Sequence, residues 1–141
     1  MQNIIFKLIP TSEILSVLPL LMQLNQKETK ETLSERLLEM TTQNYECVGI
    51  YDGAKLIGIA GLWFQTRHYS GRSIEPDHVI ILDEYRNKGL GKRLFEWIDN
   101  YAKSKNCTAV ELNSYVGNTA SHKFYYNEGF KIMGFHFVKQ F

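Results

Sequence analysis

The sequence is poor in the residues that build metal centres and disulfides. It has two cysteines among 141 residues, Cys47 and Cys107, and neither belongs to a Cys-x-x-Cys pair or a Cys/His cluster. A metal site of that kind needs several such ligands at short spacing. We therefore expect no metal, and two reduced thiols of the kind that a cytosolic protein keeps.

Long apolar runs and a strong excess of one charge are also missing. The apolar run at residues 14–22 is too short to cross a bilayer and contains Ser16 and Pro19. The first residues lack the apolar core and the cleavage site of a signal peptide. The formal net charge is +1, whereas general nucleic-acid binders usually carry a large basic excess. We expect a cytoplasmic protein that binds neither membranes nor nucleic acid.

The chain has enough apolar material for one packed domain. Hydrophobic residues make up 44% and aromatic residues 13%, and no repeat or linker interrupts them. Alternating and helical patterns predict strands joined by helices in an order typical of a mixed α/β (α+β) domain spanning residues 1–141. The predicted strands are residues 3–9, 46–51, 55–64, 74–82, 108–112 and 130–141, the last closing the sheet, with a loop at 65–73.

One stretch has the pattern of an anion site. Residues 86–91 follow an apolar run at residues 79–82 and lead into a helical pattern, which is the order strand, turn, helix. Amides at a helix N-terminus have no partner within the helix and lie at the positive end of its dipole, so they can hold a phosphate or pyrophosphate. Gly89 and Gly91 let a ligand approach the backbone closely. Positive charge around them comes from Arg86, Lys88, Lys92 and Arg93.

The turn alone leaves two interpretations open. Two glycines two residues apart at a helix start also form an ordinary tight turn. The turn has neither the Gly-x-x-x-x-Gly-Lys-Ser/Thr pattern of a phosphate loop nor the third glycine of a dinucleotide fingerprint. A nucleotide-binding protein is therefore disfavoured, and the rest of the chain must decide.

A second motif lies downstream at residues 118–130, Asn-Thr-Ala-Ser-His-Lys-Phe-Tyr-Tyr-Asn-Glu-Gly-Phe. It is similar to the Asn-x-x-Ala-x-x-Leu/Phe-Tyr-x-x-x-Gly-Phe motif of the GNAT superfamily of acyl-CoA-dependent N-acetyltransferases, with Ser121 in place of an alanine. Residues 86–91 resemble the same family's Arg/Gln-x-x-Gly-x-Gly/Ala motif. Both motifs in one chain, with a strand between them, make the resemblance specific, although the first half matches in element order only.

The resemblance implies a GNAT-like fold and acetyl-CoA as the co-substrate. That fold is a central mixed, mostly antiparallel sheet with a splayed fourth and fifth strand pair, flanked by helices. In the family, the turn holds the pyrophosphate of coenzyme A and the strand before it binds the pantetheine arm. Carried onto this sequence, the acetyl-CoA-binding residues are Val79, Ile80, Ile81, Leu82, Arg86, Asn87, Lys88, Gly89, Leu90, Gly91, Lys92, Asn118 and Tyr125.

The resemblance also assigns a catalytic role to Tyr125. The tyrosine at this position of the motif faces the thioester sulfur and acts as the general acid. A phenol suits that role because its pKa of about 10 is roughly matched to that of a thiol. Composition alone favours a packed aromatic, and the motif around Tyr125 reverses that preference.

A base is needed as well, because an alkyl ammonium with a pKa near ~10 must lose a proton before it attacks. Glu75 and Asp77 lie two apart in a predicted strand and share a face if pairing is regular, so both are candidates. Two carboxylates at a solvated strand end explain them equally well. His78 is a third candidate, because a histidine suits a base, but it is predicted on the opposite face as a buried, hydrogen-bonded side chain. Pro76 removes one strand donor, so the strand is expected to begin later or to bulge.

The main interpretation is an N-acetyltransferase that acts on a primary amine of a small molecule or peptide. We expect the acceptor beside loops 25–30 and 65–73 and the C-terminal strands, with Trp63, His68, Tyr69 and Arg72 as candidate contacts. The alternative is an inactive acyl-CoA-binding or protein-interaction module of the same fold. In the family, such domains often pair through their C-terminal strands, and the aromatic tail is compatible with a homodimer as well as with core packing.

Overall fold

The computed structural model describes residues 3–141, whose centre is a five-stranded sheet with its strands in chain order. β1 to β4 pair antiparallel, and β5 pairs parallel to β4. The strands are β1 (Ile4–Leu8), β2 (Tyr45–Asp52), β3 (Lys55–Arg67), β4 (Gly71–Ile81) and β5 (Ala109–Val110).

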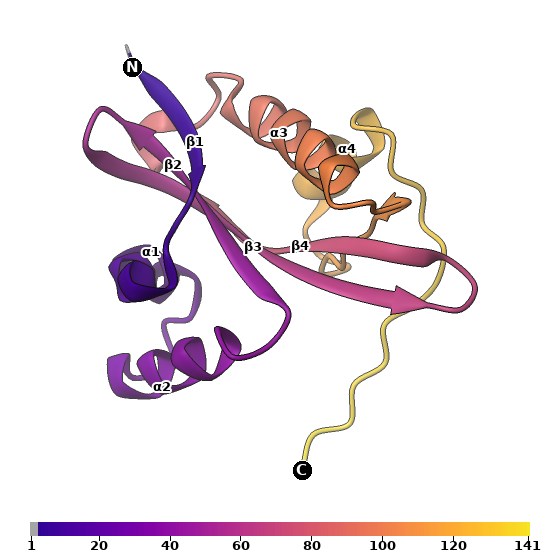
Figure 1. Cartoon of the computed structure of the whole chain (residues 1–141), viewed down its shortest axis with the longest axis horizontal. Coiled ribbons are helices and arrows are strands. Elements are labelled where there is room, and N and C mark those ends of the chain that lie inside the picture. The colour runs from indigo at the N-terminus through magenta and orange to yellow at the C-terminus, as the bar shows by residue number, and fades with distance from the viewer. Residues whose placement is uncertain (1–2) are drawn as a thin grey trace.

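Helices cover both faces of the sheet (Figure 1). One face carries the 3-10 helix η1 (Thr11–Val17), α1 (Leu18–Leu24) and α2 (Lys30–Met40). The other carries α3 (Leu90–Ser104), with α4 (Thr119–Asn127) beside it and the short 3-10 helix η2 (Asp83–Tyr85) before it. Within the described part, no helix combines the length and apolarity needed to span a membrane.

Alternation along the central strands separates two apolar cores. Cys47 and Ile59 pack toward η1, α1 and α2, whereas their neighbours Val48 and Ala60 pack toward α3. This is the period of two that a sheet with both faces covered requires. The predicted mixed α/β fold is therefore confirmed, including the splayed fourth and fifth strands: β4 and β5 pair only at Ser73–Ala109 and Ile74–Val110.

The loop predicted at residues 65–73 is wrong. β3 and β4 stay paired to their tips, through Gln65–Ser73 and Arg67–Gly71. Polar residues there indicated a loop, but their side chains bond across the hairpin, as the Gln65 amide does to the Glu75 carboxylate at 3.2 Å. A polar sequence can therefore form a strand when cross-strand partners satisfy it.

A β-bulge interrupts β4 at His78, which has a left-handed φ of 33°. The register against β3 shifts between Ile59 and Gly61, so one extra residue of β4 is accommodated there. The bulge turns the His78 ring onto the same side as Asp77, where the two side chains meet at 3.6 Å. The prediction that His78 faces away from Asp77 is therefore wrong, because it assumed regular alternation.

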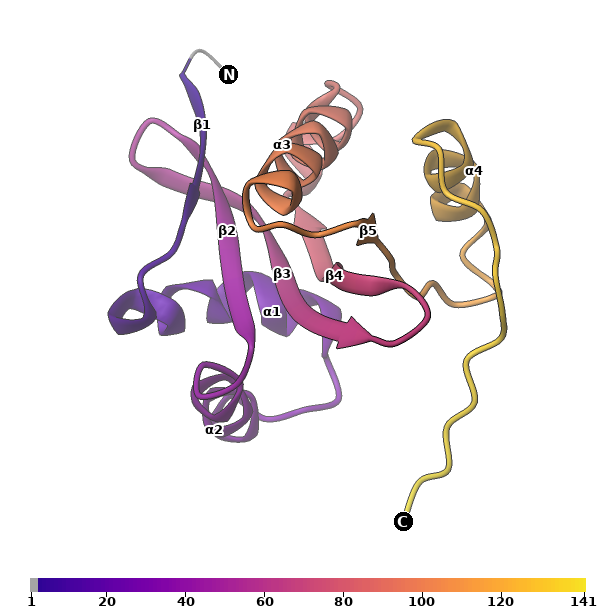
Figure 2. The same ribbon diagram turned by 45° about the vertical axis from the view of Figure 1, so that its right-hand side comes forward.

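The last predicted strand, residues 130–141, is also absent from the described chain. Residues 131–141 are exposed, and no strand pairs with them. Figure 2 shows this segment leaving α4 as an extended trace that runs away from the sheet. The strand-like pattern is real, but a strand needs a neighbour, and the chain supplies none in this arrangement.

Candidate active site

The glycine turn places unpaired amides at the start of α3. Asn87 and Gly89 both have left-handed φ values, 59° and 78°, and Gly89 is the N-cap with no side chain capping it. The N–H groups of Leu90, Gly91 and Lys92 make no hydrogen bond to any atom of residues 3–141. The chain therefore presents three donors together at the positive end of a helix dipole, which is suited to an anion.

The two positions of the turn, residues 89 and 91, require glycine for different structural reasons. Gly89 needs its positive φ, and a Cβ there would meet nothing within 4 Å. At Gly91 a Cβ would lie 3.3 Å from Phe124 of α4, so this glycine lets α3 and α4 approach each other. The sequence motif did not distinguish these two roles.

The cations beside the turn also differ in what they do. Arg86 folds back, since its Nε donates to the Ile81 carbonyl at 3.0 Å and its guanidinium pairs with Asp83 at 3.1 Å. Lys88 lies over the Tyr85 ring at 5.8 Å. Lys92 is exposed and has no ion pair within the described chain. Arg86 thus fastens the turn to β4, and Lys92 is the cation left for a ligand.

The second half of β4 has an open side. β5 pairs with β4 no further than Ile74, so the edge that carries Val79 and Ile80 has no strand beside it in the described residues. Leu82 is partly used, because its N–H donates to the Ile57 carbonyl at 2.9 Å. An extended ligand can add along this edge through backbone hydrogen bonds.

Tyr125 projects from α4 into an aromatic cluster. Its ring lies 5.8 Å from that of Phe95 and 5.7 Å from that of Phe130. No hydrogen bond of its hydroxyl is found within residues 3–141, and burial raises the pKa of Tyr125 above its ordinary value. Asn118 has a structural task here, since its side chain accepts from the Ser121 N–H at 3.4 Å and caps α4.

Asp77 and His78 belong to a compact polar cluster on the α1–α2 side. The Tyr45 hydroxyl and His78 Nε2 are 2.8 Å apart, and Trp63 Nε1 donates to Asp77 at 3.3 Å. Hydrogen bonding to His78 lowers the pKa of Asp77 to about 2, outweighing the opposing effect of burial. Gly61 makes room for this cluster, because a Cβ there would lie 2.1 Å from the His78 ring.

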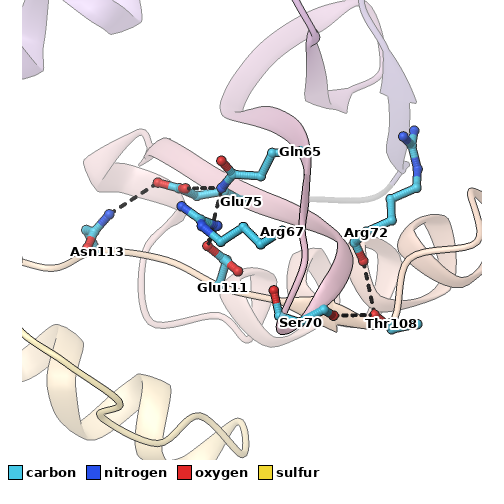
Figure 3. A network of polar contacts seen from close by, with 8 residues as sticks. All are labelled: Gln65, Arg67, Ser70, Arg72, Glu75, Thr108, Glu111 and Asn113. Atoms are coloured by element: carbon cyan, nitrogen blue, oxygen red, sulfur yellow. Dashed lines mark hydrogen bonds and ion pairs between the residues drawn. The ribbon is translucent and has the colours of Figure 1, made fainter.

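Glu75 belongs to a second network that joins β3, β4 and the segment after β5 (Figure 3). Its carboxylate accepts from Gln65 at 3.2 Å and from Asn113 at 3.3 Å. Gln65 also reaches Glu111 at 3.3 Å, and Glu111 pairs with Arg67. The network therefore holds the strands together at the point where β4 and β5 separate.

The structure brings together only some of the site residues that the sequence predicted. Glu75 and Asp77 share a strand face as predicted, but the bulge adds His78 to it. The rings of His68 and Tyr69 meet edge to face in the hairpin turn, with their centroids 5.2 Å apart, and Arg72 instead lies over the Phe64 ring at 5.0 Å. The sequence did not indicate the polar partners Tyr45, Gln65, Arg67, Glu111 and Asn113. None of them belongs to a sequence motif, and they meet only because strands distant in the sequence pair with each other.

Comparison with known proteins first identifies the protein family. A sequence model of the acetyltransferase (GNAT) family matches residues 15–130, which is most of the chain. The chain therefore belongs to the GNAT acetyltransferase family, as its two motifs predicted. Members of this family use acetyl-CoA, so the predicted class of acetyl-CoA-dependent acyltransferase is supported.

Individual relatives add limited information about the activity. The aminoalkylphosphonate N-acetyltransferase of Salmonella typhimurium is 26% identical over 86 residues, covering 60% of this chain and 56% of that protein. The match thus spans little more than half the length of that curated relative.

Solved structures agree in fold along the whole chain. The ribosomal-protein-alanine N-acetyltransferase of Brucella melitensis biovar Abortus 2308 has a TM-score of 0.83 at 20% identity, covering 99% of each chain. AAC(6')-Iy, bound to the bisubstrate analogue CoA-S-monomethyl-acetylneamine, has a TM-score of 0.85 at 14% identity, covering 99% of this chain and 98% of its own. At these identities the likeness establishes the fold alone.

Proposed function

We propose that residues 1–141 act as one catalytic domain that transfers the acetyl group of acetyl-CoA to a primary amine. The observation that carries this proposal is the set of unpaired N–H groups at Leu90, Gly91 and Lys92, which open α3 directly beside the open edge of β4. Coenzyme A needs both features, because it has a pyrophosphate at one end and an amide-containing arm toward the thioester.

Acetyl-CoA, when bound, supplies an activated acetyl group as a thioester. The α3 amides and Lys92 hold its pyrophosphate by charge-assisted hydrogen bonds. The backbone of Val79 and Ile80 hydrogen-bonds the extended arm as an added strand would. The thioester oxygen becomes negative as the amine attacks, and an N–H group on the open edge of β4 after the bulge is suited to it; the His78 N–H itself donates to Asp77.

Glu75 is the stronger of the two predicted base candidates. A useful base has a pKa near the working pH, and Asp77, with its pKa of about 2, holds a proton poorly. Asp77 instead orients His78 and gives the acceptor side a fixed negative charge. Glu75 accepts the proton of the amine, directly or through water, while Gln65 and Asn113 keep its carboxylate in place.

Tyr125 donates the proton that the departing thiol needs. Its hydroxyl has no partner among the described residues, so it is available to the sulfur. Because burial raises its pKa, the phenol stays protonated at neutral pH. Tyr125 is therefore prepared as an acid and not as a base.

The acceptor class follows from the charge of this side of β4. Glu75 and Asp77 share this face of β4, Gln65 links Glu75 to Glu111, and Arg67 pairs with Glu111. A cationic amine is favoured by such a surface. We infer a small-molecule or peptide amine, in keeping with a relative named as an aminoalkylphosphonate N-acetyltransferase and with a solved structure of the same fold bound to the bisubstrate analogue CoA-S-monomethyl-acetylneamine.

The competing function is an acyl-CoA-binding module without turnover. Release of free thiol from acetyl-CoA, measured with a panel of amines that includes diamines, aminoglycosides, aminoalkylphosphonates and peptides, separates the two. The proposal predicts amine-dependent thiol release with at least one class. Tight acetyl-CoA binding with no release above the amine-free rate for any class would favour the binding module.

A further inference from the structure

The bulge in β4 holds a non-glycine residue in a conformation that costs free energy. His78 has a left-handed φ of 33° although it lies within a strand, and only 7% of its side chain is exposed. Such a conformation persists only where the surrounding structure fixes it, and it is most often found where a functional group must be held in place. The contacts that fix His78 are therefore candidates for a role in the reaction.

The carboxylate of Asp77 holds the bulge from within β4. Its Oδ1 accepts from the His78 N–H at 2.9 Å, and its Oδ2 lies 3.6 Å from His78 Nδ1. Hydrogen bonding to His78 lowers the pKa of Asp77 to about 2, so the carboxylate is ionised at neutral pH. A neutral His78 ring therefore carries its proton on Nδ1, the nitrogen that faces the carboxylate.

The hydroxyl of Tyr45 holds the same ring from the other side. With the proton on Nδ1, His78 Nε2 is an acceptor, and the Tyr45 hydroxyl lies 2.8 Å from it. Tyr45 is buried, and burial raises its pKa, so the phenol keeps its proton and donates it to this bond. The Tyr45 ring is itself held against that of Trp63, with the centroids 4.9 Å apart. Both nitrogens of the His78 ring are thus fixed.

The contact between Tyr45 and His78 joins two strands that are not neighbours in the sheet. Tyr45 belongs to β2 and His78 to β4, and β3 lies between them. The His78 ring lies over β3 at Gly61, where a Cβ would be 2.1 Å from the ring. A hydroxyl on the far strand therefore fixes the position of the bulge relative to the rest of the sheet.

We propose that Tyr45 is a positioning residue for acetyl transfer. Through the His78 ring it fixes the bulge, and with it the N–H group that β4 presents to the thioester oxygen. The His78 N–H is taken by Asp77, so this donor belongs to the residues that follow along the open edge. A donor aimed at a developing negative charge acts on the transition state, so its displacement lowers the rate and not the affinity. This inference rests on the proposed acetyl-transfer function.

Tyr45→Phe tests the role, because it removes one oxygen and keeps the ring beside Trp63. Single-turnover rates are measured with acetyl-CoA saturating and with the most active amine of a panel of diamines, aminoglycosides, aminoalkylphosphonates and peptides. We expect the rate to fall at least about 10-fold while the Kd for acetyl-CoA, which is set at the start of α3, changes less than about twofold. An unchanged rate overturns the proposal.

Tyr101→Phe is the matched control. The Tyr101 hydroxyl donates to Glu46 of β2 at 2.6 Å, on the face of the sheet that packs against α3. This variant therefore also loses one hydrogen bond between a tyrosine and the sheet, but far from the bulge, and it should keep the rate of the parent. An equal loss of rate in both variants would mean that Tyr45 only stabilises the sheet.

A second substitution shows whether Tyr45 acts through His78. Asparagine tolerates the left-handed conformation, so His78→Asn removes the ring and keeps the backbone of the bulge accessible. In that background Tyr45→Phe should change the rate by less than about twofold, since the two residues act as one unit. The full loss of rate in both backgrounds would show that Tyr45 acts by another route, and would overturn the proposal.

Backbone NMR without substrates separates this inference from the proposed function. The amide resonances of Val79 and Ile80 should move in Tyr45→Phe and stay in place in Tyr101→Phe. Unmoved amides in Tyr45→Phe would overturn the positioning role whether or not the protein is active. A parent protein that acetylates no amine of the panel would instead refute the proposed function, and the amide shifts would still decide whether Tyr45 holds the bulge.

Discussion

At the residue scale, side chains that the sequence presented as equivalent candidates have different surroundings in the structure. Glu75 and Asp77 were equal candidates for the base, yet hydrogen bonding to His78 lowers the pKa of Asp77 to about 2, while Glu75 is held by two amides. The Tyr125 hydroxyl makes no hydrogen bond within residues 3–141, and burial raises its pKa. The chemistry of each residue is therefore set by its partners and not by its type.

Glu75→Gln and Asp77→Asn should consequently have different kinetics. We expect Glu75→Gln to lower kcat by roughly 10²-fold or more and to remove the acidic limb of the pH–rate profile. Asp77→Asn should keep that limb and change mainly the KM for the amine. Steady-state rates across pH with acetyl-CoA saturating measure both effects, and an acidic limb lost only in Asp77→Asn would reverse the assignment.

The same pKa predicts an effect on stability at acid pH. A carboxyl whose folded pKa is lowered stabilises the fold above its unfolded pKa, near 3.8, and this contribution is lost as the pH falls toward about 2. The Asp77 side chain is 55% exposed, so solvent screening limits the effect to about 1 kcal/mol. Urea unfolding at neutral pH and near pH 2 should show a smaller acid-induced loss in Asp77→Asn than in the parent.

Tyr125→Phe keeps the ring among Phe95 and Phe130 and removes only the hydroxyl. We expect kcat to fall by roughly 10²-fold with little change in acetyl-CoA affinity, because the lost group acts on the leaving thiol. Single-turnover rates and a direct binding measurement check the two parts. Unchanged turnover at every pH would exclude Tyr125 as the acid.

At the element scale, β4 determines where the groups lie. Its separation from β5, its His78 bulge and the turn that follows it all lie between residues 74 and 91. The turn and the helix after it have local signals, whereas the splayed strands were implied by the family resemblance. Pro76 predicted that this strand begins later or bulges, but the position of the bulge at His78 was not predictable, because it depends on Gly61 of β3 accepting the His78 ring.

Gly61→Ala tests this dependence. A Cβ at Gly61 would lie 2.1 Å from the His78 ring, so the ring must move and lose its bond to Tyr45. We expect a loss of roughly 1–3 kcal/mol in the free energy of unfolding. In the double variant with His78→Ala the clash disappears, so the two changes should be less than additive. Strict additivity would mean that Gly61 does not serve the bulge.

At the scale of the whole molecule, the sheet is incomplete on one side. The sequence predicted a strand at residues 130–141, and its pattern is indeed strand-like, but a single chain gives it no neighbour. The hydrophobic pattern of a segment shows which structure it can form. Whether it does form a strand depends on a neighbouring strand that it can pair with.

The central claim is that the amides opening α3 hold the pyrophosphate of acetyl-CoA, and substitution at Gly89 tests it most directly. Asn and Asp have nearly the same size and both tolerate the left-handed conformation at this position, so Gly89→Asn and Gly89→Asp differ chiefly in charge. The negative charge favours the helix dipole but repels a pyrophosphate.

Calorimetric titration with acetyl-CoA, together with the Tm of each variant, separates binding from folding. We predict that Gly89→Asp binds acetyl-CoA at least about 10-fold more weakly than Gly89→Asn, a difference of about 1.4 kcal/mol, while its Tm is equal or higher. Equal affinities in two folded variants would show that the pyrophosphate is not held at this turn.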